Sequence, residues 1–203
     1  MRWVGKMIHN NKPVIMFGAG QRAEILHCLL HQVGYEIAAF CLDAAWRKTD
    51  RFKERPVVDF EGIDQIYAPH EYQLIVAVGY QHLNQLRADR VAAAQAMGYE
   101  LLSYISPEAS LWPGFVPGVH CRIGTRSLIQ PFAEVGDNVS IGSGCIIGHH
   151  SKIQDHAFIA SGVMLGGGGC GDRALRFCGY GCRDSQQCPY WPEQRDWKWC
   201  GDS

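Results

Sequence analysis

The sequence predicts an α/β domain with a parallel sheet, then a left-handed parallel β-helix, then an irregular C-terminal tail. Three observations predict this order. Apolar strands alternate with helical patterns in the first part, an aliphatic residue recurs every sixth position in the middle, and that period is lost abruptly near the end. The predicted bounds of the three parts are 1–100, 101–169 and 170–203.

The bulk composition places the chain among globular proteins. Its 203 residues suffice for one large or two small domains with a real core. A net charge of −1 gives no reason to expect a nucleic-acid partner. The clearest apolar run, 74–78, is too short to cross a bilayer, and the N-terminus does not resemble a signal peptide. We therefore expect a cytoplasmic protein without membrane insertion.

The first part predicts strands over 13–17, 36–42 and 72–78, and helices over 24–33 and 83–97. This alternation indicates a parallel sheet with right-handed crossovers. A glycine-rich turn joins the first strand to the first helix and reads Gly18-Ala-Gly-Gln-Arg-Ala23. Backbone N–H groups in such a turn, at a helix N-terminus, can bind a phosphate. A tight turn with no ligand is the alternative interpretation.

Candidate ligand-binding residues of this part cluster at strand ends, where open α/β sheets bind their ligands. Asp43 follows the second strand and could accept a ribose hydroxyl or a uracil. Tyr80 follows the third strand. The predicted substrate-binding set is Gly18, Gly20, Gln21, Asp43 and Tyr80.

The middle part repeats every six residues. Ten of eleven successive positions are aliphatic: Ile105, Leu111, Pro117, Ile123, Ile129, Val135, Ile141, Ile147, Ile153, Ile159 and Leu165. This period fits neither an α-helix nor an alternating strand, but it fits a solenoid with three flat faces and eighteen residues per coil. The aliphatic side chains are predicted to point inward. The stretch 112–120 breaks the pattern and is predicted to be a loop or a distorted turn.

Two companion positions accompany each inward residue. From 121 on, the residue two places before it is small or modest in size, and we expect it to pack beside the aliphatic side chain. The residue after it is often glycine, which we expect to help the chain turn each corner. These glycines are Gly124, Gly136, Gly142, Gly148 and Gly166.

The nine cysteines fall into two groups. Four sit singly in apolar patterns and are predicted to be buried small hydrophobes: Cys28, Cys41, Cys121 and Cys145. Five lie in the tail: Cys170, Cys178, Cys182, Cys188 and Cys200. Their spacing matches no standard zinc site, so a zinc module competes with a shifted reading frame as the origin of the tail. The tail composition predicts that the prism does not continue.

Four segments together resemble one known family. They are Gly18-Ala-Gly20, Ala77-Val-Gly-Tyr80, the bridge from Gly98 to Pro107, and Ile147-Gly-His-His-Ser151. Over residues 12–169 the chain is similar to bacterial sugar O- and N-acyltransferases of the hexapeptide-repeat type, such as sialic acid O-acetyltransferases and nucleotide-amino-sugar N-acetyltransferases. The resemblance implies a Rossmann-like N-terminal domain that binds a nucleotide sugar, acetyl-CoA as donor, a homotrimer, and a role in surface polysaccharide synthesis.

His149 is the predicted catalytic base. Neutral imidazole can take a proton from an attacking amine or hydroxyl near pH 7, and the family's catalytic histidine aligns here. One coil of eighteen residues places Gly167 above His149, where its N–H can donate to the thioester oxyanion and help to bind acetyl-CoA. Related enzymes follow this histidine with an acidic residue, whereas this chain has His150.

Two other functions remain open at this stage. The short repeat and altered tail are consistent with a truncated, catalytically impaired relative that only binds a nucleotide sugar. His149, His150 and His156 also allow a zinc enzyme resembling the γ-class carbonic anhydrases, although we expect no metal. The sequence alone does not distinguish O- from N-acylation.

Overall fold

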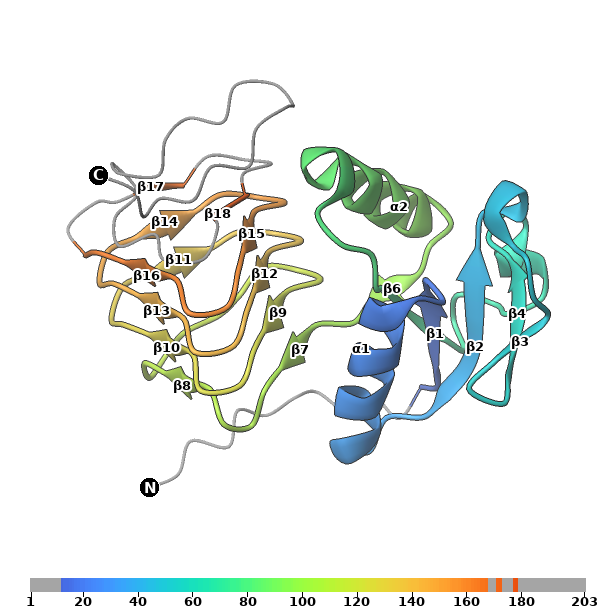
Figure 1. Cartoon of the computed structure of the whole chain (residues 1–203), viewed down its shortest axis with the longest axis horizontal. Coiled ribbons are helices and arrows are strands. Elements are labelled where there is room, and N and C mark those ends of the chain that lie inside the picture. The colour runs from blue at the N-terminus through green and yellow to red at the C-terminus, as the bar shows by residue number, and fades with distance from the viewer. Residues whose placement is uncertain (1–11, 168–170, 173–176, 179–203) are drawn as a thin grey trace. The chain divides into compact units, whose positions relative to one another are not determined.

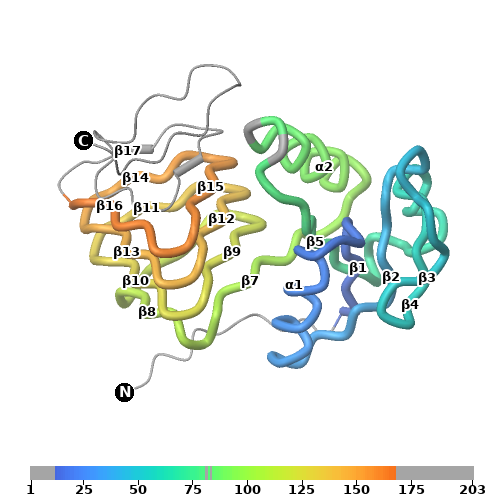
Figure 2. Tube along the Cα trace, viewed as in Figure 1, coloured from blue at the N-terminus to red at the C-terminus, as the bar shows by residue number. Residues whose placement is uncertain are grey.

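The computed structural model describes residues 12–167, 171–172 and 177–178. The described chain divides into two compact units, 12–104 and 105 onward (Figures 1 and 2). Among the described residues, no helix has the length and apolar character that crossing a membrane requires.

The first unit is built on a six-stranded sheet in the order β3-β4-β2-β1-β5-β6. Neighbouring strands run parallel, except that β3 pairs antiparallel with β4 at one edge. The strands are β1 (Val14–Phe17), β2 (Ile37–Leu42), β3 (Arg51–Phe52), β4 (Arg55–Asp59), β5 (Gln73–Val76) and β6 (Glu100–Leu101). The helices are α1 (Gln21–Gln32) and α2 (Gln85–Ala96), with short 3-10 turns η1 (Ala44–Trp46), η2 (Ile63–Gln65) and η3 (Gln81–Asn84). The predicted parallel sheet and both long helices are confirmed, while β3, β4 and β6 were not predicted.

The two faces of this sheet pack against different helices. Successive residues of a strand point to opposite faces. Val14 and Met16 of β1 accordingly share a core cluster with Leu26 of α1. Ile15 and Phe17 share a second cluster with the apolar side of α2. β1 and β5 are parallel neighbours in the sheet, so their carboxyl ends lie at the same edge. α1 begins shortly after the end of β1, and α2 follows β5.

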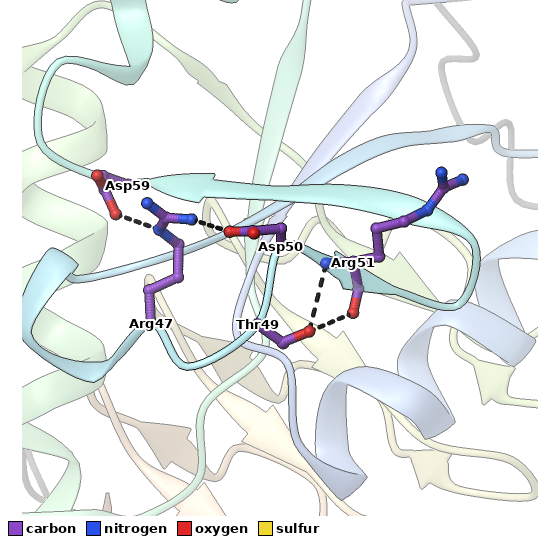
Figure 3. Close-up of polar contacts among 5 residues, drawn as sticks. All are labelled: Arg47, Thr49, Asp50, Arg51 and Asp59. Carbon is purple, nitrogen blue, oxygen red and sulfur yellow. Dashed lines mark hydrogen bonds and ion pairs between the residues drawn. The ribbon is translucent and has the colours of Figure 1, made fainter.

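A set of polar contacts anchors the loop between β2 and β4 (Figure 3). The Arg47 guanidinium donates from Nε to Asp59 Oδ1 at 2.6 Å and also contacts the carboxylate of Asp50. Thr49 Oγ1 donates to the carbonyl of Arg51 at 3.0 Å. These contacts fix the chain that follows Asp43.

The second unit consists of short parallel strands in three sheets, and Figure 1 shows them stacked coil upon coil. One sheet contains β7 (Tyr104–Ile105), β9 (Arg122–Ile123), β12 (Ser140–Ile141), β15 (Phe158–Ile159) and β18 (Phe177–Cys178). The second contains β8 (Ser110–Leu111), β10 (Leu128–Ile129), β13 (Ile146–Ile147) and β16 (Met164–Leu165). The third contains β11 (Glu134–Val135), β14 (Lys152–Ile153) and β17 (Gly171–Asp172). Within 112–121, all of which is described, no strand forms, as expected from the broken pattern.

The inward aliphatic stack is confirmed. Ile129, Ile147 and Leu165 pair in register, with eighteen residues between successive members. The isoleucines of this stack at 123, 129, 141, 147 and 159 are all 0% exposed. The repeat and the parallel sheets fit a left-handed β-helix.

The corners of the prism are formed by residues with positive φ, and not by the glycines that follow the inward residues. A residue with positive φ recurs every sixth position, three places after each inward residue: Gly114, His120, Arg126, Phe132, Asn138, Gly144, His150, His156 and Gly162. The glycines directly after the inward residues do not have positive φ. A Cβ on Gly124 would lie 2.6 Å from the backbone N of Ser143 in the next coil, and one on Gly142 would lie 2.7 Å from Ser161 Cα. These glycines allow coils to approach closely, so the expectation that they turn the corners was wrong.

The small residues do more than pack. Each hydroxyl or thiol of Cys121, Ser127, Cys145 and Ser151 donates to a carbonyl fifteen residues on, at 3.1, 2.8, 3.1 and 3.1 Å respectively. Burial raises the pKa of the Cys145 thiol, which keeps its proton available for this bond. The four bonds tie successive coils together inside the prism.

The tail continues the prism further than its composition suggested. β17 and β18 extend two of the sheets, but Ile153 pairs with Asp172 and Ile159 with Cys178. The spacing is therefore nineteen residues instead of eighteen, so one residue is inserted after Leu165. The zinc and shifted-frame interpretations of the tail concern residues that lie mostly outside the described ones.

One of the four single cysteines departs from the expectation. Cys41, Cys121 and Cys145 are buried, as predicted, but Cys28 is exposed. Leu26 and Leu30 face the core from α1, and a residue halfway between them along a helix points to the opposite side. The prediction that Cys28 is buried was therefore wrong.

The close approach of the coils can be tested with one methyl group. Gly142→Ala should destabilise the protein by about 1–3 kcal/mol, because its Cβ would meet backbone that cannot move away. The measurement is urea unfolding of purified protein, with exposed Ser143→Ala as the matched control. Equal midpoints for both variants would contradict this account of the glycine.

Candidate functional site

His149 lies at a corner of the β-helix, in the turn between β13 and β14. The inward packing of Ile147 and Ile153 on either side fixes the turn, and the His149 side chain is exposed. Its backbone N–H donates to Gln130 Oε1 on the preceding coil at 3.0 Å. The imidazole is thus accessible while its backbone is anchored.

Gly167 lies against the His149 ring, one coil further along. A Cβ added to Gly167 would lie 2.6 Å from both Cδ2 and Nε2 of His149. Any larger residue would therefore push the imidazole aside. The missing side chain at 167 lets the ring and the backbone come together.

The peptide group that carries the Gly167 N–H is held from inside the prism. Ser151 Oγ donates to the Gly166 carbonyl at 3.1 Å. In a trans peptide the C=O and the following N–H point in opposite directions. The inward bond on Gly166 therefore aims the Gly167 N–H away from Ser151, and buried Gly148 leaves room for this peptide.

His150 contacts His149 directly. The two Nδ1 atoms lie 3.1 Å apart, and the rings are nearly perpendicular at 86°. Asp155 is not an alternative partner, because its Oδ1 accepts the backbone N–H of Asp137 at 2.8 Å. The sequence shows that the expected acidic residue is missing, but it does not show that the His150 ring contacts the His149 ring.

The three histidines considered for a metal have separate environments. His156 Nδ1 pairs with Asn138 Nδ2 at 2.8 Å, and Asn138 Oδ1 pairs with His120 Nδ1 at 2.9 Å. Within the described part of the chain, no group of three or more His, Cys, Asp or Glu side chains is arranged to hold a metal ion. The zinc-enzyme interpretation therefore gains no support from a single chain.

The glycine-rich turn lies at the carboxyl end of β1. Gly18 is buried with φ 119° and donates from N to the Cys41 carbonyl at 2.9 Å. Gly20 is exposed and extended immediately before α1, and exposed Gln21 is the first helical residue. The turn thus presents backbone to solvent at the start of the helix.

Tyr80 contacts Arg22, a residue that the sequence analysis did not predict to be part of the site. The Arg22 guanidinium lies over the Tyr80 ring, 5.5 Å from its centroid. A Cβ on buried Gly79 would lie 2.9 Å from Arg22 Nε, so glycine at 79 makes room for this side chain. The signal available in the sequence was the position of Arg22 in the first turn after the glycines.

Asp43 already has a partner within the chain. Arg90 NH2 donates to Asp43 Oδ2 at 2.9 Å, and Arg90 Nε lies 2.9 Å from Oδ1 as an ion pair without hydrogen-bond alignment. The Asp43 side chain is 13% exposed, and the guanidinium also lies 5.8 Å from the ring centroids of Phe17 and Phe60. A role for Asp43 in binding a ligand hydroxyl stays a prediction.

One protein-family model matches the part of the chain that contains the six-residue repeats. The model described as bacterial transferase hexapeptide (six repeats) matches residues 120–155 and 133–167. These residues are bacterial transferase hexapeptide repeats. The resemblance to hexapeptide-repeat acyltransferases, first inferred from the sequence, is confirmed for this part of the chain. No curated protein matches the chain by sequence.

Solved structures share the fold over most of the chain. PerB from Caulobacter crescentus, in complex with CoA and GDP-perosamine, is 21% identical with a TM-score of 0.60, over 85% of this chain and 91% of that one. WeeI from Acinetobacter baumannii is 15% identical with a TM-score of 0.56, over 77% and 89%. The acetyltransferase domain of PglB from Neisseria gonorrhoeae, in complex with acetyl coenzyme A, is 18% identical with a TM-score of 0.54, over 80% and 93%. At these identities the likeness establishes the fold.

Proposed function

We propose that this protein transfers an acetyl group from acetyl-CoA to an amine or hydroxyl of a nucleotide-linked sugar. The observation that carries the proposal is the exposed His149 imidazole against the Gly167 backbone on a hexapeptide-repeat corner. Structures of the same fold hold CoA with GDP-perosamine, or acetyl coenzyme A.

The reaction assigns one task to each group. The acceptor nitrogen or oxygen attacks the thioester carbonyl, the new C–N or C–O bond forms, and the C–S bond breaks. His149 Nε2 takes the acceptor's proton and returns it to the leaving thiolate. The Gly167 N–H stabilises the negative charge that develops on the carbonyl oxygen. A backbone donor suits this task because it needs little reorganisation during the reaction.

The nucleotide part of the acceptor is assigned to the α/β unit, for which the order of the parallel strands supports a Rossmann-like fold. In the turn that begins at Gly18, the exposed residues Gly20 and Gln21 offer backbone N–H groups to a phosphate, whereas the Gly18 N–H already donates to the Cys41 carbonyl. Arg22 adds a positive charge beside it, and Tyr80 adds an aromatic ring. Together these groups have the chemistry of a nucleoside diphosphate site.

The wider setting of the reaction is part of the same proposal. We propose a homotrimer in the cytoplasm that acts in surface polysaccharide synthesis. The four cysteines in the described N-terminal and repeat regions are all free thiols, which is typical of a reducing compartment. Either an amine or a hydroxyl fits the proposed proton transfer, so the acceptor atom is left open.

A second candidate function is binding of a nucleotide sugar without acetyl transfer. One observation favours it: the spacing between paired strands is eighteen residues at β16 but nineteen at β17, the next strand after Gly167. An altered coil there would change the surface available to acetyl-CoA. Tight nucleotide-sugar binding without thiol release would support this candidate over the first.

The role of His149 is tested by replacing it. His149→Asn should lower kcat/KM by about a hundredfold or more, because the proton acceptor is lost. The measurement is thiol release from acetyl-CoA with a panel of UDP-, dTDP- and GDP-linked amino sugars. Exposed His70→Asn serves as the control and should keep wild-type activity. Full turnover by His149→Asn would remove the catalytic assignment.

The role of Ser151 is tested by a matched pair of serines. Ser151→Ala and Ser127→Ala each lose one buried bond to a carbonyl, and Ser127 Oγ also accepts the Cys145 N–H at 3.3 Å. Ser127→Ala should therefore be destabilised at least as much as Ser151→Ala, each by about 1 kcal/mol or more. Only Ser151→Ala should lower kcat, by about tenfold or more, because the peptide that carries the Gly167 N–H is then no longer held in its orientation. Ser151→Cys should restore much of the rate, since Cys121 and Cys145 make the same bond elsewhere. Equal kcat values for the two alanine variants would refute this role.

A further inference from the structure

The contact between His149 and His150 requires one shared proton. Two neutral imidazole nitrogens 3.1 Å apart attract one another only if one carries hydrogen and the other offers its lone pair. If Nδ1 of His149 carries the hydrogen, its Nε2 is free to accept a proton. If Nδ1 of His150 carries it, His149 accepts at Nδ1, its own hydrogen sits on Nε2, and it cannot act as a base there.

The exposed His150 residue contacts the preceding coil through both its backbone and its ring. Its backbone has φ 58°, and its N–H donates to the Pro131 carbonyl at 3.2 Å. Its ring packs on Phe132 with centroids 4.9 Å apart, and Phe132 packs in turn on Trp112 at 5.6 Å. We call these three side chains the aromatic corner; Trp112 packs against the core of the β-helix. This anchoring holds His150 Nδ1 where it meets His149.

We propose that His150 is a positioning residue that accepts the Nδ1–H of His149 on its own Nδ1 and so holds His149 in the tautomer with a free Nε2. The inference rests on the proposed acetyl transfer and extends it. It assigns a neutral pair of histidines to the place where a charged carboxylate would otherwise orient the base. The Nε2 so freed lies on the edge of the His149 ring that faces Gly167.

Three substitutions at position 150 test whether the hydrogen-bond acceptor or the aromatic ring of His150 is required. His150→Asn and His150→Asp keep an acceptor and suit the left-handed backbone at this position. His150→Phe keeps a ring on the aromatic corner but has no acceptor, and Phe132 shows that phenylalanine is accommodated at the same kind of corner. Arg126→Asn, at the corresponding place of another corner, is the control.

The expected results concern kcat and KM separately. His150→Phe should lose about tenfold to a hundredfold in kcat with little change in KM, as misplacement of a base predicts. His150→Asn and His150→Asp should stay within about tenfold of the wild-type kcat. The Arg126→Asn control should retain the wild-type rate.

A second readout does not depend on turnover. Long-range 1H–15N NMR spectra at neutral pH should show His149 protonated at Nδ1 in the wild type, and predominantly at Nε2 in His150→Phe. A wild-type His149 protonated at Nε2, or a His150→Phe enzyme with unchanged kcat, would overturn the positioning role. Failure of the acetyl transfer itself would instead appear as full activity in His149→Asn or as no thiol release by the wild type.

Discussion

The filled axis of the β-helix is the constraint on which the rest of the structure depends. From Ile123 to Leu165 the residue at every sixth position is aliphatic and buried, and successive coils pair in register with eighteen residues per turn from β8 to β16. An inserted residue would move every later inward side chain out of the core. The fixed coil length, and not a property of His149 itself, therefore places residue 167 one coil above residue 149. The register changes only after Leu165, beyond the coil that the site needs.

Close packing between coils then determines the chemistry that a corner can carry. Neighbouring coils lie about 4.8 Å apart, so a side chain at one corner meets the backbone of the next. Gly148 makes room for the peptide between Gly166 and Gly167, and Gly167 makes room for the imidazole of His149. Ser151 holds that peptide from within. The proposed base and the proposed N–H donor thus lie on adjacent coils that packing holds together, which suits electrostatic stabilisation of a transition state.

Periodic features could be predicted from the sequence, and features made by distant residues could not. The inward stack and the meeting of His149 with Gly167 follow from counting, because the solenoid repeats a fixed step. The pairing of Asp43 with Arg90 joins residues 47 positions apart, and no local pattern reveals it. The roles proposed for Arg22 and His150 likewise depend on contacts with residues distant in the sequence, Tyr80 for Arg22 and Phe132 for His150. The glycines were misassigned because sequence shows where glycine occurs but not whether φ or space requires it.

The most direct measurement of the central claim is a crystal structure of the full chain with CoA. The account predicts Leu165 one coil above Ile147, the Gly167 backbone against the His149 ring, and the CoA thiol within reach of His149 Nε2. A coil of any other length between Ile147 and Leu165, or a thiol bound away from that corner, would contradict it.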